Sequence, residues 1–371
     1  MLQTFMSFSF GCRVNEAEKQ VLDKKLLEAG FSWNENNPEF YIINSCAVTG
    51  KAEREVRQHI YQIRKKYPKT KIIATGCSAT LWLKNNILLT EVDYWIENKE
   101  KNTIAEFMFS LSSRDSCLPA GRASSKTPRN DISSDKFIKS GRIMIKIQDG
   151  CDRFCSYCVV LFTRGRATSK TIAEIVKEIQ QITLPIQEII LTAINTEYFG
   201  RNTGETLTEL VDSILTHTKV DRVSFGSIHP WSITPKFLSW YKKNKNNHRF
   251  VHFFHIPIQS GSNIILKLMN RQYTKEEILK KLQTLHTINP KALIATDVIV
   301  GFPGETEREF RETYDFLKNS PISKFHVFRY SPRPETAAMN LLNEPAHQEK
   351  RERAKNLAEL GKKKYNSYLM L

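Results

Sequence analysis

Three cysteines in the middle of the chain have a spacing that suits metal chemistry. Cys151, Cys155 and Cys158 form the pattern Cys-x3-Cys-x2-Cys. Three thiolates on one short loop can bind three irons of a four-iron cluster, which leaves the fourth iron open to a small chelating molecule. A zinc site would need a fourth Cys or His nearby, and the next candidate, His229, lies far along the chain. The pattern therefore predicts an iron–sulfur cluster with one open iron.

A second set of three cysteines is spread over the first part of the chain. Cys12, Cys46 and Cys77 are 34 and 31 residues apart, and each comes one to two residues after an expected strand. The carboxyl ends of parallel strands lie at one edge of a sheet, where ligands bind. We therefore expect these cysteines to converge on a second three-thiolate site. The alternative is three unrelated buried cysteines. Cys117 we expect to be a free thiol without a role.

The elements that would position the second set alternate along residues 1–112. Apolar runs and helix-ending residues predict strands at residues 4–10, 40–44 and 71–75, and helices at 15–29 and 51–67. Strands that alternate with helices are typical of a parallel sheet with helices on both faces. The first domain, residues 1–112, is therefore expected to be a doubly wound α/β sheet.

Residues 113–140 are rich in Ser, Pro and Gly and lack apolar periodicity, so we expect a linker there. A second series of strands and helices fills residues 141–338, where Thr171 with Glu174 and Thr306 with Glu309 form capping boxes that open helices. Six strands within about 190 residues indicate a partial or full (β/α) barrel, with a second doubly wound sheet as the alternative. Residues 339–371 read as a helical extension.

The charge balance and the hydropathy limit the partners and the compartment. The 371 residues contain 55 Lys plus Arg and 39 Asp plus Glu, a net charge of +16. Such a balance favours a polyanionic partner or an acidic membrane surface, although an ordinary basic enzyme is the alternative. A run of 18 apolar residues is absent, and the N-terminus does not resemble a signal peptide. We therefore expect a cytoplasmic protein without a membrane span, whose cysteines are reduced.

Longer motifs surround the six grouped cysteines. They are Gly11-Cys-Arg-Val-Asn15, Asn44-Ser-Cys-Ala-Val-Thr49, Thr75-Gly-Cys77, Lys146-Ile-Gln-Asp-Gly-Cys151, Arg164-Gly-Arg166, His255-Ile-Pro-Ile-Gln-Ser-Gly-Ser262 and Asp297-Val-Ile-Val-Gly-Phe-Pro-Gly-Glu-Thr306. With these motifs the sequence resembles the radical S-adenosylmethionine (SAM) methylthiotransferases over almost its whole length. The motifs around Cys12 and Cys46 resemble most the branch that acts on threonylcarbamoyladenosine in tRNA.

The resemblance implies a fold, cofactors and a reaction. It implies a radical SAM barrel in which Cys151, Cys155 and Cys158 bind a [4Fe-4S] cluster that chelates S-adenosylmethionine and reduces it to a 5′-deoxyadenosyl radical. It implies a second [4Fe-4S] cluster at the other cysteine set, which holds the sulfur. A second S-adenosylmethionine then supplies the methyl group, and a methylthio group replaces hydrogen at C2 of the adenine next to the anticodon. We expect a monomer that takes electrons from a donor such as flavodoxin or ferredoxin.

Five further residues are candidates for the S-adenosylmethionine pocket. The resemblance implies that Tyr157 contacts the adenine of the cofactor, whereas a packed loop aromatic is the alternative. Gln259 and Asp297 lie near the ends of expected strands, where barrel enzymes place functional groups. Asn195 and Gly301 are weaker candidates of the same kind.

The sequence also departs from the family pattern. Leu161, Ala193 and Glu335 stand where the family usually has Pro, Gly and Gly, and His229 stands where this branch has an acidic residue. The family usually ends in a small RNA-binding β-barrel, but only about 35 residues follow Thr336. We therefore expect that the chain lacks this RNA-binding domain or is truncated.

Without that domain, surface cations must contact the tRNA. Basic residues are concentrated at 51–71, 242–249 and 362–364, and Arg64, Lys65 and Lys66 are the first candidates for phosphate contacts. Each run taken alone is more often a solvated face. The alternatives for function are a methylthiotransferase acting on isopentenyladenosine in tRNA or on a ribosomal-protein aspartate, an iron–sulfur redox protein, and a non-catalytic RNA-binding protein with structural zinc.

Overall fold

The computed structural model describes residues 3–114, 141–182 and 186–370. The chain divides into two compact units, Met1–Met144 and Ile145–Leu371. Most of the expected linker and Cys117 lie outside the described residues. No helix among the described residues is long and apolar enough to cross a membrane. The domain boundaries that we expect from the sequence remain predictions.

The first unit contains a five-stranded parallel sheet in the order β2-β1-β3-β4-β5. Its strands are β1 (Thr4–Ser9), β2 (Ser32–Trp33), β3 (Phe40–Ser45), β4 (Lys71–Gly76) and β5 (Tyr94–Trp95). The three strands that we predicted are confirmed within one or two residues. The edge strands β2 and β5 were not predicted, because two residues are too few to show a periodicity. The chain changes direction across the sheet between β1 and β3, which makes their carboxyl ends the usual ligand site of such a sheet.

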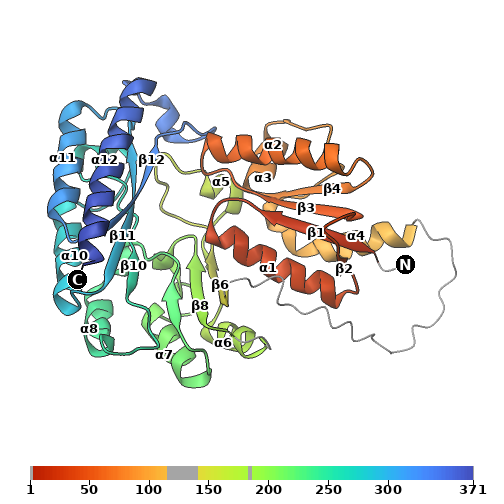
Figure 1. Ribbon diagram of the computed structural model, residues 1–371, viewed down its shortest axis with the longest axis horizontal. Helices are drawn as coiled ribbons and strands as arrows, with labels where there is room; N and C mark the ends of the chain where they lie inside the picture. Colours follow the sequence, from red (N-terminus) through yellow and green to blue (C-terminus); the bar gives the residue numbers. More distant parts are fainter. Residues whose placement is uncertain (1–2, 115–140, 183–185, 371) are drawn as a thin grey trace. The chain divides into compact units, whose positions relative to one another are not determined.

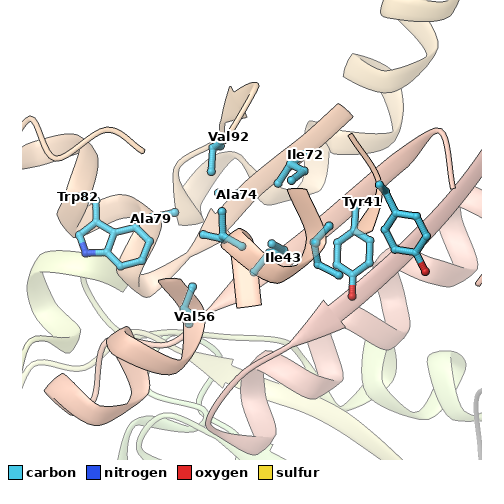
Figure 2. Close-up of a cluster of buried hydrophobic side chains, with 11 residues drawn as sticks. Tyr41, Ile43, Val56, Ile72, Ala74, Ala79, Trp82 and Val92 are labelled. Carbon is cyan, nitrogen blue, oxygen red and sulfur yellow. The ribbon is translucent and has the colours of Figure 1, made fainter. Parts of the chain in front are cut away.

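Helices cover both faces of this sheet, as a doubly wound fold requires (Figure 1). They are α1 (Arg13–Glu28), α2 (Gly50–Lys66), α3 (Cys77–Lys84) and α4 (Ile104–Arg114). Adjacent residues of β3 point to opposite faces: Ile42 packs in one cluster with α1 and α4, and Ile43 packs in the other with α2 and α3. Figure 2 shows the second cluster. Each buried side chain of this size stabilises the fold by about 1.5–3 kcal/mol.

The second unit is built on two sheets that meet at one bridge. The strand orders are β7-β6-β8-β9 and β10-β11-β12, and a parallel bridge between Val223 and Phe250 connects them. The strands are β6 (Arg142–Asp149), β7 (Thr168–Ser169), β8 (Glu188–Ala193), β9 (Val223–Phe225), β10 (Phe253–His255), β11 (Leu293–Val300) and β12 (Lys324–Arg329). Because β7 and β12 are the outer strands, the described residues form the partial version of the expected barrel.

Helices connect these strands, and several begin at capping boxes. They are α5 (Val160–Arg164), α6 (Ile172–Gln180), α7 (Leu207–His217), α8 (Pro235–Asn244), α9 (Asn263–Leu268), α10 (Lys275–Ile288), α11 (Glu307–Asn319) and α12 (His347–Tyr368). The capping boxes predicted at Thr171 and Thr306 are both present. Two more open α7 and α10, at Thr206 and Thr274, and the sequence analysis had missed them.

The C-terminal helix α12 is part of the second unit (Figure 1). It packs on β12, β11 and α11, and it buries Leu357 and Leu360. Arg353 on α12 donates hydrogen bonds to the carbonyl and the carboxylate of Glu305, at 2.8 and 2.9 Å. The residues that we expected to form a helical extension therefore include a helix that packs on the outer strand β12 of this unit.

Candidate active site

The structure brings the three cysteines of the first unit to the carboxyl edge of its sheet. Cys12 is the N-cap of α1, Cys46 directly follows β3, and Cys77 is the first residue of α3. A Cβ on Gly11 would lie 2.2 Å from the sulfur of Cys46, so only glycine lets these two loops approach so closely. Ser78 donates a hydrogen bond to the carbonyl of Cys46 at 2.5 Å. The loop with Cys12 and the helix with Cys77 thus both contact Cys46 or its backbone.

Two asparagines of the motifs that flank the cysteines form hydrogen bonds across the carboxyl edge of this sheet. The side chain of Asn15 donates to the carbonyls of Phe10 and Ser45, at 2.8 and 3.0 Å. The side chain of Asn44 donates to the carbonyl of Asn15 at 2.8 Å. These hydrogen bonds connect the turn after β1 with the turn after β3. Both asparagines therefore hold the cysteine loops together.

The thiols of the first unit suit a cluster. Cys46 and Cys77 are buried, with 3% and 7% of their surface exposed, and Cys12 is half-buried. Cys12 and Cys77 lie at helix N-termini, where the positive end of the helix dipole attracts an anionic group such as a bound cluster. Burial protects these sulfurs from solvent, and the two helix N-termini attract negative charge.

Neither cysteine set has the spacing of a zinc site. Sulfur ligands of one tetrahedral zinc, at Zn–S of about 2.3 Å, would lie about 3.8 Å apart. Among the six cysteines that the structure describes, no three form a group that could hold one metal ion. A four-iron cluster places each ligand on a different iron, so its sulfurs are farther apart. The donor sets therefore fit a cluster better than a single zinc ion.

The other three cysteines lie on the loop that follows β6. The side chain of Asn195 donates a hydrogen bond to the sulfur of Cys151 at 3.6 Å. The backbone N–H of Asn195 donates to Oε1 of Gln148 at 2.9 Å. Burial raises the pKa of Cys151, and burial followed by the neighbouring Cys155 raises the pKa of Cys158 to about 12. The metal-free thiols therefore keep their protons at neutral pH, and metal binding has to displace them.

The cysteine loop rests on the segment at residues 268–272, which the sequence analysis missed. The backbone N–H of Ser156 donates to the carbonyl of Met269 at 3.1 Å, and the side chain of Asn270 donates to the carbonyl of Phe154 at 2.9 Å. This segment begins at the last residue of α9, more than 100 residues after the cysteines. Its residue types carry no local signal of this role, so sequence patterns could not have identified it.

Tyr157 has a packed environment. Its ring meets the ring of Phe302 edge to face, with centroids 6.4 Å apart, and it joins a cluster that contains Met269 and Tyr330. This is the packing that the alternative interpretation of Tyr157 expects. Contact of Tyr157 with the cofactor remains a prediction.

Asp297 is held by two histidines in the second unit. Its carboxylate accepts from Nε2 of His255 at 2.9 Å and from Nδ1 of His326 at 3.2 Å. Burial alone would raise the pKa of Asp297, but these two hydrogen bonds outweigh burial and lower the pKa to about 2. Gln259 lies next to Asp297, because its backbone N–H donates to the Asp297 carbonyl at 2.9 Å. Two of the pocket candidates, Gln259 and Asp297, therefore lie side by side, and Asp297 carries a negative charge.

Gly301 has a packing role that the sequence did not indicate. Its φ is +70°, and a Cβ there would lie 2.3 Å from Cγ of Lys350 on α12. Its backbone N–H donates to the buried carboxylate of Glu305 at 2.5 Å. Glycine at this position therefore allows α12 to pack closely.

The departures from the family pattern have visible consequences. Glu335, at an expected glycine position, adopts φ +64°, a conformation that costs a non-glycine residue free energy. His229 accepts a hydrogen bond from the backbone of Thr196 at 3.3 Å, and burial lowers its pKa to about 3. A neutral side chain thus stands where the resemblance implies an acidic residue. Leu161 lies inside α5, and Ala193 ends β8.

Arg64, the first of the expected RNA contacts, is occupied within the fold. Its guanidinium donates to the carbonyls of Glu91, Pro68 and Thr70, and it pairs with Asp93 at 2.5 Å. This corrects our expectation that Arg64 is a cation available to phosphate. Two residues of the other basic runs are engaged in the same way, by backbone carbonyls: Arg249 and Lys364.

Lys65 and Lys66 remain exposed on α2. Lys66 also lies over the ring of Tyr67, 4.8 Å from its centroid. In the first basic run, therefore, the surface that remains for an anionic partner includes these two lysines and excludes Arg64.

Two family models match the chain, one in each unit. Residues 4–96 match an uncharacterized protein family, UPF0004, and residues 145–317 match the Radical SAM superfamily. The second match contains the whole cysteine loop after β6.

Proteins with assigned names are similar over nearly the whole chain. A threonylcarbamoyladenosine tRNA methylthiotransferase of Aquifex aeolicus is 32% identical over 97% of this chain and 88% of its own length. The enzyme of the same name from Thermotoga maritima is 32% identical over 97% of this chain and 82% of its own. A tRNA-2-methylthio-N(6)-dimethylallyladenosine synthase of Protochlamydia amoebophila is also 32% identical over 97% of this chain, and 81% of its own.

Solved structures support the fold. The radical S-adenosylmethionine methyltransferase TsrM from Kitasatospora setae matches 91% of this chain and 74% of its own with a TM-score of 0.61, at 13% identity. The cobalamin-dependent S-adenosylmethionine radical enzyme OxsB matches 98% of this chain and 56% of its own with a TM-score of 0.57, also at 13% identity. At such low identity the likeness concerns the fold alone.

The barrel strands, the cysteine loop and the family match together define a radical SAM enzyme, which uses a [4Fe-4S] cluster and S-adenosylmethionine. The similarity of both units to single relatives is more specific. The chain belongs to the radical SAM methylthiotransferase family.

Proposed function

We propose that this protein transfers a methylthio group to C2 of N6-threonylcarbamoyladenosine next to the anticodon of tRNA. In this proposal it uses two [4Fe-4S] clusters, and S-adenosylmethionine serves as both radical source and methyl donor. One observation carries the proposal: four relatives that bear the name threonylcarbamoyladenosine tRNA methylthiotransferase are 31–32% identical over 97% of the chain. The motifs around Cys12 and Cys46 agree with that branch.

We assign Cys151, Cys155 and Cys158 to the cluster that chelates S-adenosylmethionine. Cys12, Cys46 and Cys77 are assigned to the cluster that carries the sulfur. When bound, these groups supply the electron, the radical and the sulfur that the reaction needs. What supports the two ligand sets is that each sits on tightly bonded loops, and that no three of the cysteines that the structure describes form a group that could hold one metal ion.

The contribution of the protein chain is positioning and protection. Asn195 holds the sulfur of Cys151 through a hydrogen bond, and the segment at residues 268–272 holds the backbone of the cysteine loop. Asp297 offers a fixed carboxylate that can accept hydrogen bonds from a ribose or an amino group. Fixed geometry matters because a primary radical attacks the nearest C–H bond, and only a well-oriented substrate presents the correct one.

A second substrate is favoured by a specific observation. The Protochlamydia amoebophila relative, a dimethylallyladenosine synthase by name, reaches the same identity and the same coverage of this chain. The alternative is therefore methylthiolation of isopentenyladenosine, which is the same nucleoside as dimethylallyladenosine.

The test is a direct competition between the two tRNAs. The reconstituted full chain, with S-adenosylmethionine and a reductant, receives tRNA that carries either threonylcarbamoyladenosine or isopentenyladenosine. We expect nucleoside mass spectrometry to find the methylthio product only on the threonylcarbamoyladenosine tRNA. A product only on the other tRNA would replace the proposed substrate with the alternative. No product on either, from protein that holds both clusters, would contradict tRNA as the substrate.

The exposed lysines of α2 lead to a prediction about tRNA binding. Each phosphate contact that is lost should lower the slope of log affinity against log salt by about 0.7–0.9. Changing Lys65 and Lys66 together to Ala should therefore weaken tRNA binding and lower the slope by about 1.4–1.8. Titrations of tRNA at several salt concentrations measure both quantities.

Lys24 and Lys25 provide the matched control. They are also exposed and adjacent, but they lie on α1, which covers the other face of the sheet. Changing both to Ala alters the net charge by the same amount and should leave the slope nearly unchanged. An equal effect of both pairs would mean that net charge, and not the α2 surface, determines the affinity.

A further inference from the structure

Arg271 is a buried cation beside one of the grouped cysteines. Only 7% of its surface is exposed. Its guanidinium donates to the sulfur of Cys155 at 3.5 Å, to the carbonyl of Pro257 at 2.9 Å and to the hydroxyl of Tyr273 at 2.7 Å. These three acceptors surround the charge, and Cys155 is the one among them that becomes an anion on binding metal.

Arg271 differs from two other arginines of this unit, Arg353 and Arg153, in lacking a carboxylate partner. Arg353 pairs with Glu305 and Arg153 pairs with Glu197. Within the part of the chain that the structure describes, no Asp or Glu is paired with Arg271. A buried charge without a counter-ion costs several kcal/mol. The fold therefore keeps a positive charge that becomes balanced once Cys155 and its neighbours carry negative charge.

The position of this charge is fixed by aromatic stacking. The guanidinium of Arg271 lies 4.4 Å from the centroid of the Trp231 ring, and that of Arg153 lies 4.1 Å from it. Both contacts are of the cation–π kind, which holds a planar guanidinium in place. Arg271 therefore cannot move away from Cys155 without breaking hydrogen bonds and stacking together.

We propose that Arg271 is the built-in counter-charge of the cluster that Cys155 ligates, and that it raises the reduction potential of this cluster. The inference rests on the proposed ligand set, Cys151, Cys155 and Cys158. Reduction adds one electron to the bound cluster without moving a proton on Arg271, so the negative charge increases beside a fixed positive one. Net charge and hydrogen bonds to the sulfurs are the main determinants of such potentials. Arg271 thereby favours the reduced form, which is the form that donates the electron to S-adenosylmethionine.

The experiment is a redox titration of the reconstituted full chain with mediators and dithionite, followed by electron paramagnetic resonance. The auxiliary cysteines Cys12, Cys46 and Cys77 are changed to Ala throughout, so that one cluster gives the signal. In Arg271→Met we expect the equilibrium constant for one-electron reduction to fall at least tenfold, a midpoint 59 mV more negative. Arg271→Lys keeps the charge and should stay close to the unchanged protein.

Arg249 gives the matched control in the same unit. Its guanidinium also has no carboxylate partner among the bonds that the structure describes and donates to the carbonyls of Leu215, Thr218 and Val220. It lies at the amino end of β9 and β10, away from the cysteine loop. Arg249→Met should leave the midpoint unchanged. An equal shift in Arg249→Met and Arg271→Met would overturn the proposal, because general loosening of the fold would then explain both.

The remaining outcomes also decide the question. An unchanged midpoint in Arg271→Met, with the cluster present, would overturn the role of the charge while leaving the ligand set intact. If Arg271→Met loses the iron, the charge is required to hold the cluster and the proposal stands only if Arg271→Lys keeps both the iron and the midpoint of the unchanged protein. Loss of iron from both variants would overturn it in favour of a purely structural role. Absence of any cluster from the protein with Arg271 intact would instead contradict the ligand set itself.

Discussion

Changing Cys155 to Ala is expected to abolish both the cleavage of S-adenosylmethionine and the methylthio product, whereas changing Cys46 to Ala should abolish the product alone. The physical reason is that we assign the two cysteines to separate ligand sets, and they lie in separate compact units. Without Cys155, the cluster that cleaves the cofactor loses a ligand. Without Cys46, the sulfur-bearing cluster is lost, but the second unit keeps its own ligands and some cleavage continues.

Three measurements check this separation. Chromatography of 5′-deoxyadenosine reports cleavage, and mass spectrometry of nucleosides reports the product. Iron analysis should give about eight irons per chain in the unchanged protein and about four after Cys151, Cys155 and Cys158 are all changed to Ala. Cys117→Ala is the control, because we expect this thiol to have no role, and both products should persist.

Two results would contradict the assignment. Full methylthio product from Cys46→Ala would show that the first unit is not the source of sulfur. Continued 5′-deoxyadenosine formation by Cys155→Ala would show that the loop after β6 does not hold the cleaving cluster. Eight irons per chain in the variant with Cys151, Cys155 and Cys158 changed to Ala would also contradict the assignment of these cysteines as ligands.

Changing Arg353 to Met is expected to lower the free energy of unfolding of the second unit by about 3–5 kcal/mol. Glu305 and Arg353 are 2% and 5% exposed, and their side chains are 2.9 Å apart. Removing the arginine leaves a buried carboxylate without its partner, which costs more than the pair contributes when both are present. Urea unfolding followed by circular dichroism measures the loss.

The double variant Glu305→Gln with Arg353→Met is the internal control. It removes the unpaired charge, and it should recover most of the stability that Arg353→Met alone loses. If the double variant is as unstable as the single one, the ion pair matters only as packing between α12 and the rest of the unit.

The decrease in the free energy of unfolding that Arg353→Met causes should depend on pH. Burial raises the pKa of Glu305 to about 6, although the hydrogen bond from Gly301 and the charge of Arg353 act in the opposite direction. A carboxyl group whose folded pKa is raised contributes stability that is present below its ordinary pKa and is lost as the pH rises through the folded value. The defect of Arg353→Met should therefore be smaller at pH 5 than at pH 7.5, and an equal defect at both would contradict the unpaired carboxylate.

The alternation of elements and both cysteine sets follow from the sequence. Neighbouring residues determine a buried strand such as Phe40–Ser45. They also determine a capping box such as that of Thr306 with Glu309. Local periodicity and local hydrogen bonds suffice to predict them. Even the convergence of Cys12, Cys46 and Cys77 could be expected, because parallel strands place their carboxyl ends on one edge. The resemblance of the motifs to those of known enzymes then indicated the protein family.

The tertiary structure decided which charged residues are available and which are used by the fold. Arg64 belongs to a basic run in the sequence, but its guanidinium is bound by carbonyls and by Asp93, 29 residues away. Arg271 has no motif that connects it with Cys155, yet the two lie in contact across 116 residues of sequence. Periodicity and spacing describe neighbours along the chain, whereas the partner of a buried charge is chosen by packing between distant segments. That is why the cysteines could be found from the sequence and the cation beside them only from the fold.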